Sequence, residues 1–185
     1  MAPETTTATN WVIDATHSDV QFKIKHLVIS TVTGSFRKFE GSAVTAGDGF
    51  TDAKVHFTMD VKSIDTNQQQ RDEHLQNGDF FAADLYPQIV FESTSFVKTG
   101  DSVFKMIGNL TLKGVTKPVE LLVEYGGSEN NGHGVIKHGF EVKGIVNRAE
   151  FGMTWNKLTD TGGLGLGEDI KLIANIQVSK QEQEA

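Results

Sequence analysis

Arg71, Asp72 and His74 are the residues most able to do chemistry, because two potential cations and a carboxylate stand within four positions in a polar stretch. Arg71 and His74 could bind an anionic headgroup through charge-assisted hydrogen bonds. The simpler interpretation, which we favour, is that Arg71 and Asp72 attach a surface helix to the neighbouring structure. Arg148 presents the same choice between a headgroup contact and an ion pair at a strand end with Glu150.

Other candidate sites are weaker. His133 and His138 could meet a metal, but no carboxylate stands beside them at ligand spacing, so we expect a solvated loop. The glycine run 162–167 lacks G-x-G-x-x-G spacing and follows no βαβ unit, which indicates a hairpin loop. The chain has no cysteine, which excludes thiolate metal sites, disulfides and cysteine nucleophiles. We therefore expect no catalytic residues, no metal and no cofactor.

Composition and charge narrow the class of protein. The 185 residues, 38% hydrophobic and 22% charged, suit one domain with a real core. The net charge of −7, without a basic block, argues against nucleic-acid binding. No apolar run approaches the roughly 18 residues of a spanning segment, and residues 1–10 lack the features of a secretory signal. We expect a cytoplasmic protein, or alternatively a periplasmic one whose signal has been removed.

Alternation of apolar and polar residues is the dominant pattern and predicts an all-β fold. Eight or nine such runs, most of them separated by glycine clusters, indicate a barrel or a sandwich. They cover residues 20–26, 30–36, 55–61, 89–97, 103–112, 119–125, 135–146 and 170–178. Phe39 is out of phase, which predicts a bulge near Arg37 and Lys38. The exception is a helical excursion over about residues 67–84, in which Thr66 and Gln69 form a capping box and Pro87 follows the end. We expect it to cover one end of a barrel.

The inward face of an eight-stranded barrel is either filled by side chains or encloses one small ligand. Gly34, Gly108 and Gly144 share the inward phase with bulky apolar residues, which favours an apolar cavity suited to a lipid. The alternative is that these glycines mark bends in the strands. The predicted lipid-binding residues are Phe22, Ile24, His26, Val32, Gly34, Phe36, Val55, Phe57, Phe80, Phe91, Met106, Gly108, Leu110, Leu121, Phe140 and Val142. The candidate headgroup contacts are Arg71, His74 and Arg148.

Several motifs in sequence order resemble one known family. They are Trp11-x-Ile13-Asp14-x-x-His17-Ser18-x-Val20-x-Phe22, Ser63-Ile64-Asp65-Thr66, Arg71-Asp72-x-His74-Leu75, the segment 108–118, and Asn147-Arg148-x-x-Phe151-Gly152-Met153. Over roughly residues 11–178 the chain resembles the YceI-like family of polyisoprenoid-binding, lipocalin-like proteins. It departs from the family at Asn109, where an Asp is expected, and in the glycine run 162–167, which affects the entrance.

The resemblance implies an eight-stranded antiparallel lipocalin-like barrel over residues 11–179 that holds an isoprenoid lipid, such as a quinone or a prenyl chain, without catalysis. Residues 1–10 and 180–185 are expected to be disordered segments. Two alternatives stay open: an enzyme acting on such a lipid with Arg71, Asp72 and His74 at the mouth, and a stress-response interaction module with a solid barrel. Transient membrane contact and a homodimer also stay open.

Overall fold

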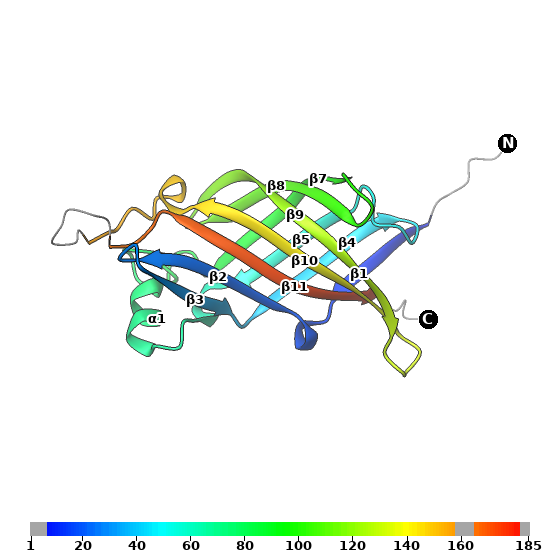
Figure 1. Cartoon of the computed structure of the whole chain (residues 1–185), viewed down its shortest axis with the longest axis horizontal. Coiled ribbons are helices and arrows are strands. Elements are labelled where there is room, and N and C mark those ends of the chain that lie inside the picture. Colours follow the sequence, from blue (N-terminus) through cyan, green and yellow to red (C-terminus); the bar gives the residue numbers. More distant parts are fainter. Residues whose placement is uncertain (1–6, 158–164, 182–185) are drawn as a thin grey trace.

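The chain folds into one antiparallel sheet that closes into a barrel (Figure 1), as seen in a computed structural model that describes residues 7–157 and 165–181. The strands are β1 (Ala8–Ile13), β2 (Asp19–His26), β3 (Ser30–Phe36), β4 (Phe39–Ala46), β5 (Lys54–Asp60), β6 (Ile64–Asp65), β7 (Gln88–Lys98), β8 (Val103–Leu112), β9 (Val115–Asn130), β10 (Ile136–Asn147) and β11 (Asp169–Lys180). The described part also holds one α-helix, α1 (Gln69–Gln76), and three short 3₁₀ turns, η1 (Ala15–His17), η2 (Val61–Ser63) and η3 (Arg148–Phe151).

The eleven strand segments form eight barrel strands, because in three cases two consecutive segments are the halves of one longer strand. β1 and β2 are separated by η1, and both lie beside β11. β3 and β4 are interrupted at Arg37 and Lys38, where the bulge was predicted, and β5 and β6 are separated by η2. Around the barrel the order is β1-β4-β5-β7-β8-β9-β10-β11, and the β1–β11 pairing closes it. The predicted eight-stranded antiparallel barrel is confirmed.

The ends of the chain differ in part from the expectation of disorder. β1 begins at Ala8 and pairs with both β4 and β11, although residues 1–10 were expected to be disordered. The polar residues of 7–10 hide this strand in the sequence, and its partners lie far along the chain. At the other end, β11 extends to Lys180. Residues 1–6 and 182–185, and residues 158–164 with the first half of the glycine run, lie outside the described residues.

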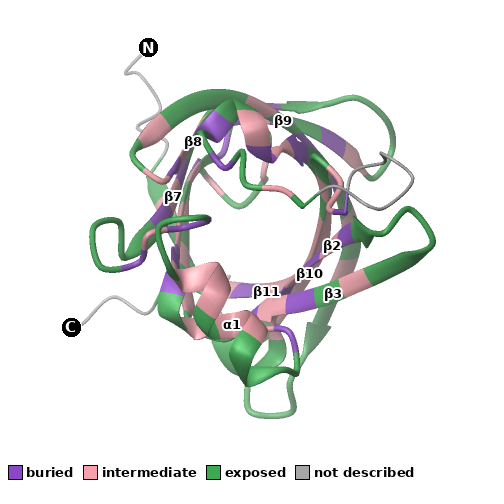
Figure 2. Ribbon diagram, turned by 90° about the vertical axis from the view of Figure 1, so that its left-hand side faces the viewer, coloured by how far each residue is buried: buried purple, intermediate pink, exposed green. Residues whose placement is uncertain are grey.

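The helical excursion was predicted at the right place, although its cap differs. α1 starts after Gln68, whose side chain makes no capping hydrogen bond, and Thr66 is not the N-cap. The Thr66 hydroxyl instead donates to Asp72 Oδ1 (2.6 Å), so it bonds to a side chain of the first turn rather than accepting from a backbone N–H. α1 buries no residue. It lies at the rim of one end of the barrel, which Figure 2 shows from that side.

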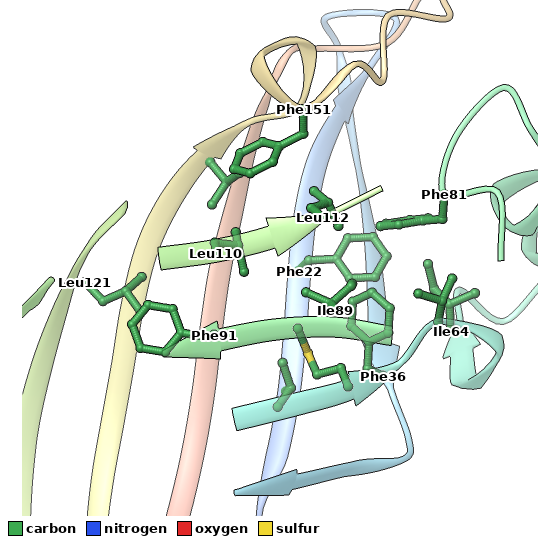
Figure 3. Packing of buried hydrophobic residues seen from close by; sticks show 14 of the residues in the cluster. Phe22, Phe36, Ile64, Phe81, Ile89, Phe91, Leu110, Leu112, Leu121 and Phe151 are labelled. Atoms are coloured by element: carbon green, nitrogen blue, oxygen red, sulfur yellow. The ribbon is translucent and has the colours of Figure 1, made fainter. Parts of the chain in front are cut away.

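The core is built mainly from phenylalanine and branched aliphatic side chains on the inward phase of the strands (Figure 3). Phe22 packs on Phe36 with ring centroids 5.6 Å apart, and Phe36 meets Phe81 edge to face at 6.0 Å. Phe81 comes from the segment after α1, so the excursion packs onto the barrel interior through its phenylalanines. The excursion therefore contributes side chains to the core at this end of the barrel.

Candidate functional site

The barrel interior holds two cavities. The first has a volume of about 170 Å³ and lies among β1, β4, β5 and the strands from β7 to β11. The second, of about 160 Å³, lies at the end covered by α1. Met59, Leu110 and Leu172 line both cavities, so the two spaces meet at one level of the barrel. Together they form an interrupted channel along the barrel.

Most of the predicted lipid-binding residues line one of these cavities. Val55, Phe57, Phe91, Met106, Leu110, Leu121, Phe140 and Val142 line the first. Phe22, Ile24, His26, Val32, Phe36, Phe80 and again Leu110 line the second. Contact of these side chains with a lipid stays a prediction. Sequence reasoning missed Met59 and Leu172, although both stand in alternating apolar runs that could have identified them.

The glycines do not supply the empty space, contrary to the expectation. A Cβ atom on Gly108 would lie 2.4 Å from the Phe91 ring and 2.5 Å from the Glu92 carbonyl oxygen. A Cβ atom on Gly34 would lie 2.3 Å from Phe22 Cζ, and one on Gly144 would lie 2.3 Å from Leu121. Neither Gly34 nor Gly108 lines a cavity. The side chain of the neighbouring strand covers each glycine, so glycine here permits a bulky neighbour to pack.

The first cavity is almost entirely apolar. Among the described residues that line it, only Ser42 and Trp11 carry a polar side-chain atom. The Trp11 indole donates its N–H to Thr45 Oγ1 at 2.8 Å and is thereby satisfied. An apolar cavity of this size stays dry, because a water molecule inside would lack hydrogen-bond partners. The space suits hydrocarbon.

The second cavity differs because polar side chains line it at the α1 end. These are His26, Thr66, Arg71 and Arg148. Arg71 donates from Nε to Thr66 Oγ1 (2.7 Å) and from Nη2 to the Thr66 carbonyl oxygen (2.6 Å). Asp72 accepts from the backbone N–H and the hydroxyl of Thr66. Arg71 and Asp72 therefore attach α1 to the barrel, as in the interpretation we favoured, while Arg71 also faces the cavity.

Arg148 is buried at the same end of the barrel and bonds to several chain segments. It is 2% exposed, and burial lowers the pKa of its guanidinium. Its Nε donates to the Gly167 carbonyl oxygen (2.8 Å), and Nη1 donates to those of Met153 and Trp155 (both 2.8 Å). A longer bond of 3.4 Å joins Nη2 to the Leu166 carbonyl oxygen. These bonds hold the segments after β10 and before β11 together, in place of the predicted strand-end ion pair.

His74 lies outside the cavity lining. Its Nε2 is 3.0 Å from Asp79 Oδ2, and its ring meets Phe80 and Trp155 edge to face, with centroids 5.1 Å and 4.8 Å away. Trp155, which is 37% exposed, was not predicted for the site, and no pattern in the sequence around it points to this position. Phe80 connects this aromatic group to the second cavity.

The remaining histidine candidates do not form a metal site. His138 Nδ1 is 2.8 Å from the Tyr125 hydroxyl, its ring meets Trp11 edge to face, and burial lowers its pKa. His133 lies in the β9–β10 turn, where its backbone N–H donates to Asn131. Residues 7–157 and 165–181 contain no group of three or more His, Asp or Glu side chains that could hold a metal ion. Within the same residues, no helix is long and apolar enough to cross a membrane.

Comparison with known proteins agrees with this architecture. A model of the YceI-like domain matches residues 11–178. A UPF0312 protein of Staphylococcus aureus is 37% identical over 175 residues, which cover 94% of this chain and 99% of the relative. The YCEI protein of Campylobacter jejuni is 37% identical with a TM-score of 0.72, covering 91% of this chain and 96% of that one.

Two more distant structures share the fold. BcnA of Burkholderia cenocepacia matches with a TM-score of 0.76 at 21% identity, over 89% of this chain and 98% of that one. A polyisoprenoid binding domain from Saccharophagus degradans matches with a TM-score of 0.66 at 14% identity, over 92% and 98%. Because the family model matches residues 11–178 and two relatives exceed 30% identity over most of their length, this chain belongs to the YceI-like family.

Proposed function

We propose that the protein binds an isoprenoid lipid, such as a prenyl chain or a quinone, non-covalently inside the barrel and acts as a carrier or store. The observation that carries this proposal is the pair of adjoining cavities, apolar in the first and polar only at the α1 end of the second. Such a gradient suits an amphiphile whose tail is hydrocarbon. The distant relative from Saccharophagus degradans, described as a polyisoprenoid binding domain, supports the same ligand class.

The position of the polar side chains at the α1 end predicts how the ligand is oriented in the barrel. The tail would occupy the first cavity and the headgroup would lie near Arg71 and His26. Two nitrogens of Arg71 are bonded to Thr66, whereas Nη1 makes no hydrogen bond to any side chain or carbonyl of the described residues. A cation with a donor left over beside a cavity can bind an anionic or carbonyl-bearing headgroup. We assign that role to Arg71 in preference to Arg148, whose donors bind backbone carbonyls.

Binding without catalysis is the reading that the polar residues favour. General acid–base chemistry needs a proton donor and acceptor that converge on the reacting atom. No carboxylate of the described chain lines the second cavity, and Asp72 is held by Thr66. An enzyme acting on the lipid is therefore the weaker proposal. A solid-barrel interaction module is also the weaker proposal, because a solid barrel would not enclose two cavities.

The test is organic extraction of the purified protein followed by mass spectrometry, with reloading of the stripped protein as the second step. We expect roughly one prenyl lipid per chain, and loss of reloading in Leu110→Asp, because a carboxylate buried against a hydrocarbon chain lacks a partner. Leu110 is 6% exposed and lines both cavities. Leu122→Asp is the matched control, since Leu122 is 43% exposed. An extract without lipid, from a protein that also fails to bind added prenyl alcohols, would refute the proposal.

A further inference from the structure

The turn between β2 and β3 exposes three consecutive aliphatic side chains. Leu27, Val28 and Ile29 are 44%, 72% and 85% exposed. Isolated apolar residues on a surface are ordinary, but three in a row at the tip of a hairpin present their side chains to water together. We call these three residues the tip.

The backbone of the tip is unfavourable for the residues that occupy it. Leu27 and Val28 have φ angles of 54° and 65°, in the left-handed region. Hairpin turns with two positive φ angles favour Asn and Gly, and a β-branched residue such as Val is a clear outlier there. Turn formation alone therefore does not explain an aliphatic tip, whereas a function that uses exposed hydrocarbon does.

The tip stands beside the polar end of the second cavity. His26, the residue before it, lines that cavity. The Leu27 N–H donates to the Gly165 carbonyl oxygen (2.8 Å), and His26 pairs with Leu166, another lining residue. Figure 1 shows the β2–β3 turn at the same end of the barrel as α1. A surface that receives the tip would thus lie close to the cavity mouth.

Three lysines lie on the outer face of the strands next to the tip. Lys25 is exposed two residues before Leu27, and Lys23 stands directly opposite Lys171 in the β2–β11 register. Like charges directly opposite in a sheet destabilise it, unless an anion lies near. The side-chain ion pairs among the described residues do not include any of these three lysines. The wall below the tip is therefore suited to an anionic surface.

We propose that the tip inserts into the interface of an anionic bilayer while Lys23, Lys25 and Lys171 lie against lipid headgroups. Three side chains on a convex tip are far smaller than the roughly 800 Å² per partner of a stable protein interface. A fluid interface needs no matching surface, and it rewards both apolar burial and basic residues. This docking would serve the transfer of lipid through the nearby mouth of the second cavity, a role that rests on the proposed function.

The experiment is flotation of the full chain with vesicles of phosphatidylcholine alone or with a quarter phosphatidylglycerol. We expect binding to the anionic vesicles, reduced at least about tenfold in the double variant Val28→Asn, Ile29→Ser, because two inserted side chains are lost. Asn tolerates positive φ, so this variant should fold with an unchanged or raised melting temperature. Ile136→Ser is the matched control, since Ile136 is 53% exposed in the β9–β10 hairpin at the other end of the barrel. Lys23→Gln with Lys25→Gln should remove the preference for phosphatidylglycerol.

Three results would overturn the docking proposal. The first is wild-type protein that does not float, and the second is equal flotation of the wild type and the tip variant. The third is a concentration-dependent dimer, seen by sedimentation, that the tip variant converts to monomer without any vesicle binding. Extractable lipid is measured in parallel and separates the two proposals. Protein that floats but neither yields lipid on extraction nor binds added prenyl alcohols refutes the carrier function alone, and protein that holds lipid but never floats refutes docking alone.

Discussion

Met59 lines both cavities where they meet, and we expect its truncation to change which chain lengths the protein prefers. Met59 is 9% exposed on β5 and lines both cavities together with Leu110 and Leu172. A short isoprenoid fits within one cavity, whereas a long chain must pass the Met59 side chain. Methionine is flexible enough to move aside. Displacing it from a preferred rotamer costs about 0.5–1.5 kcal/mol, which is a factor of about 2–12 in affinity.

Met59→Ala removes this obstacle. We expect the affinity for a long isoprenoid alcohol such as solanesol, relative to a short one such as farnesol, to rise by about that factor. The truncation also enlarges a cavity in the ligand-free protein, which costs about 2–5 kcal/mol and lowers the melting temperature by about 5–15 °C in a domain of this size. Bound long-chain ligand should restore much of that loss, because it fills the space.

The assay is titration of stripped protein with each alcohol, followed through tryptophan fluorescence, to which Trp11 in the lining of the first cavity contributes. Met106→Ala is the matched control: it removes the same atoms from a residue that is 5% exposed and lines only the first cavity. It should lose similar stability without any change in the ratio of affinities. If both variants shift the ratio equally, or neither does, Met59 does not divide the channel and the reasoning is wrong.

Three further predictions concern stability. Gly108→Ala should lose about 1–3 kcal/mol in urea unfolding, because its Cβ would meet Phe91 and the Glu92 carbonyl oxygen, whereas Gly78→Ala, with open space around it, should change little. Arg148→Met should lose about 3–5 kcal/mol by leaving buried carbonyl oxygens unpaired, and a wild-type melting curve would contradict this. Hydrogen bonds chiefly from His17 and also from Lys137 lower the pKa of Asp14 from 3.8 to about 2, so its stabilisation is present above pH 4 and lost as pH falls towards 2. Asp14→Asn should flatten the stability–pH curve in that window, and an unchanged slope there would show that Asp14 does not contribute.

Period-two alternation and glycine-bounded spacing predicted an all-β barrel or sandwich with one helical excursion, and the family resemblance favoured the eight-stranded barrel. Both properties are local: each strand shows its buried face within a few residues. The same alternation identified most cavity-lining residues, since an inward position remains inward whatever its partner. Their residue types identified Arg71 and Arg148 as candidate headgroup contacts or structural ion-pair partners, without deciding what each side chain contacts.

What only the tertiary structure decided depends on cross-strand neighbours. Gly108 looked like empty space, yet the register of β7 and β8 places the Phe91 ring over it. Arg148 looked like a headgroup contact, yet segments brought together by folding supply carbonyl oxygens for its donors. The shared lining of the two cavities by Met59, Leu110 and Leu172 likewise requires three strands to meet at one level. Register and long-range packing decide where the space lies, because a side chain fills or leaves a volume only in relation to residues distant in sequence.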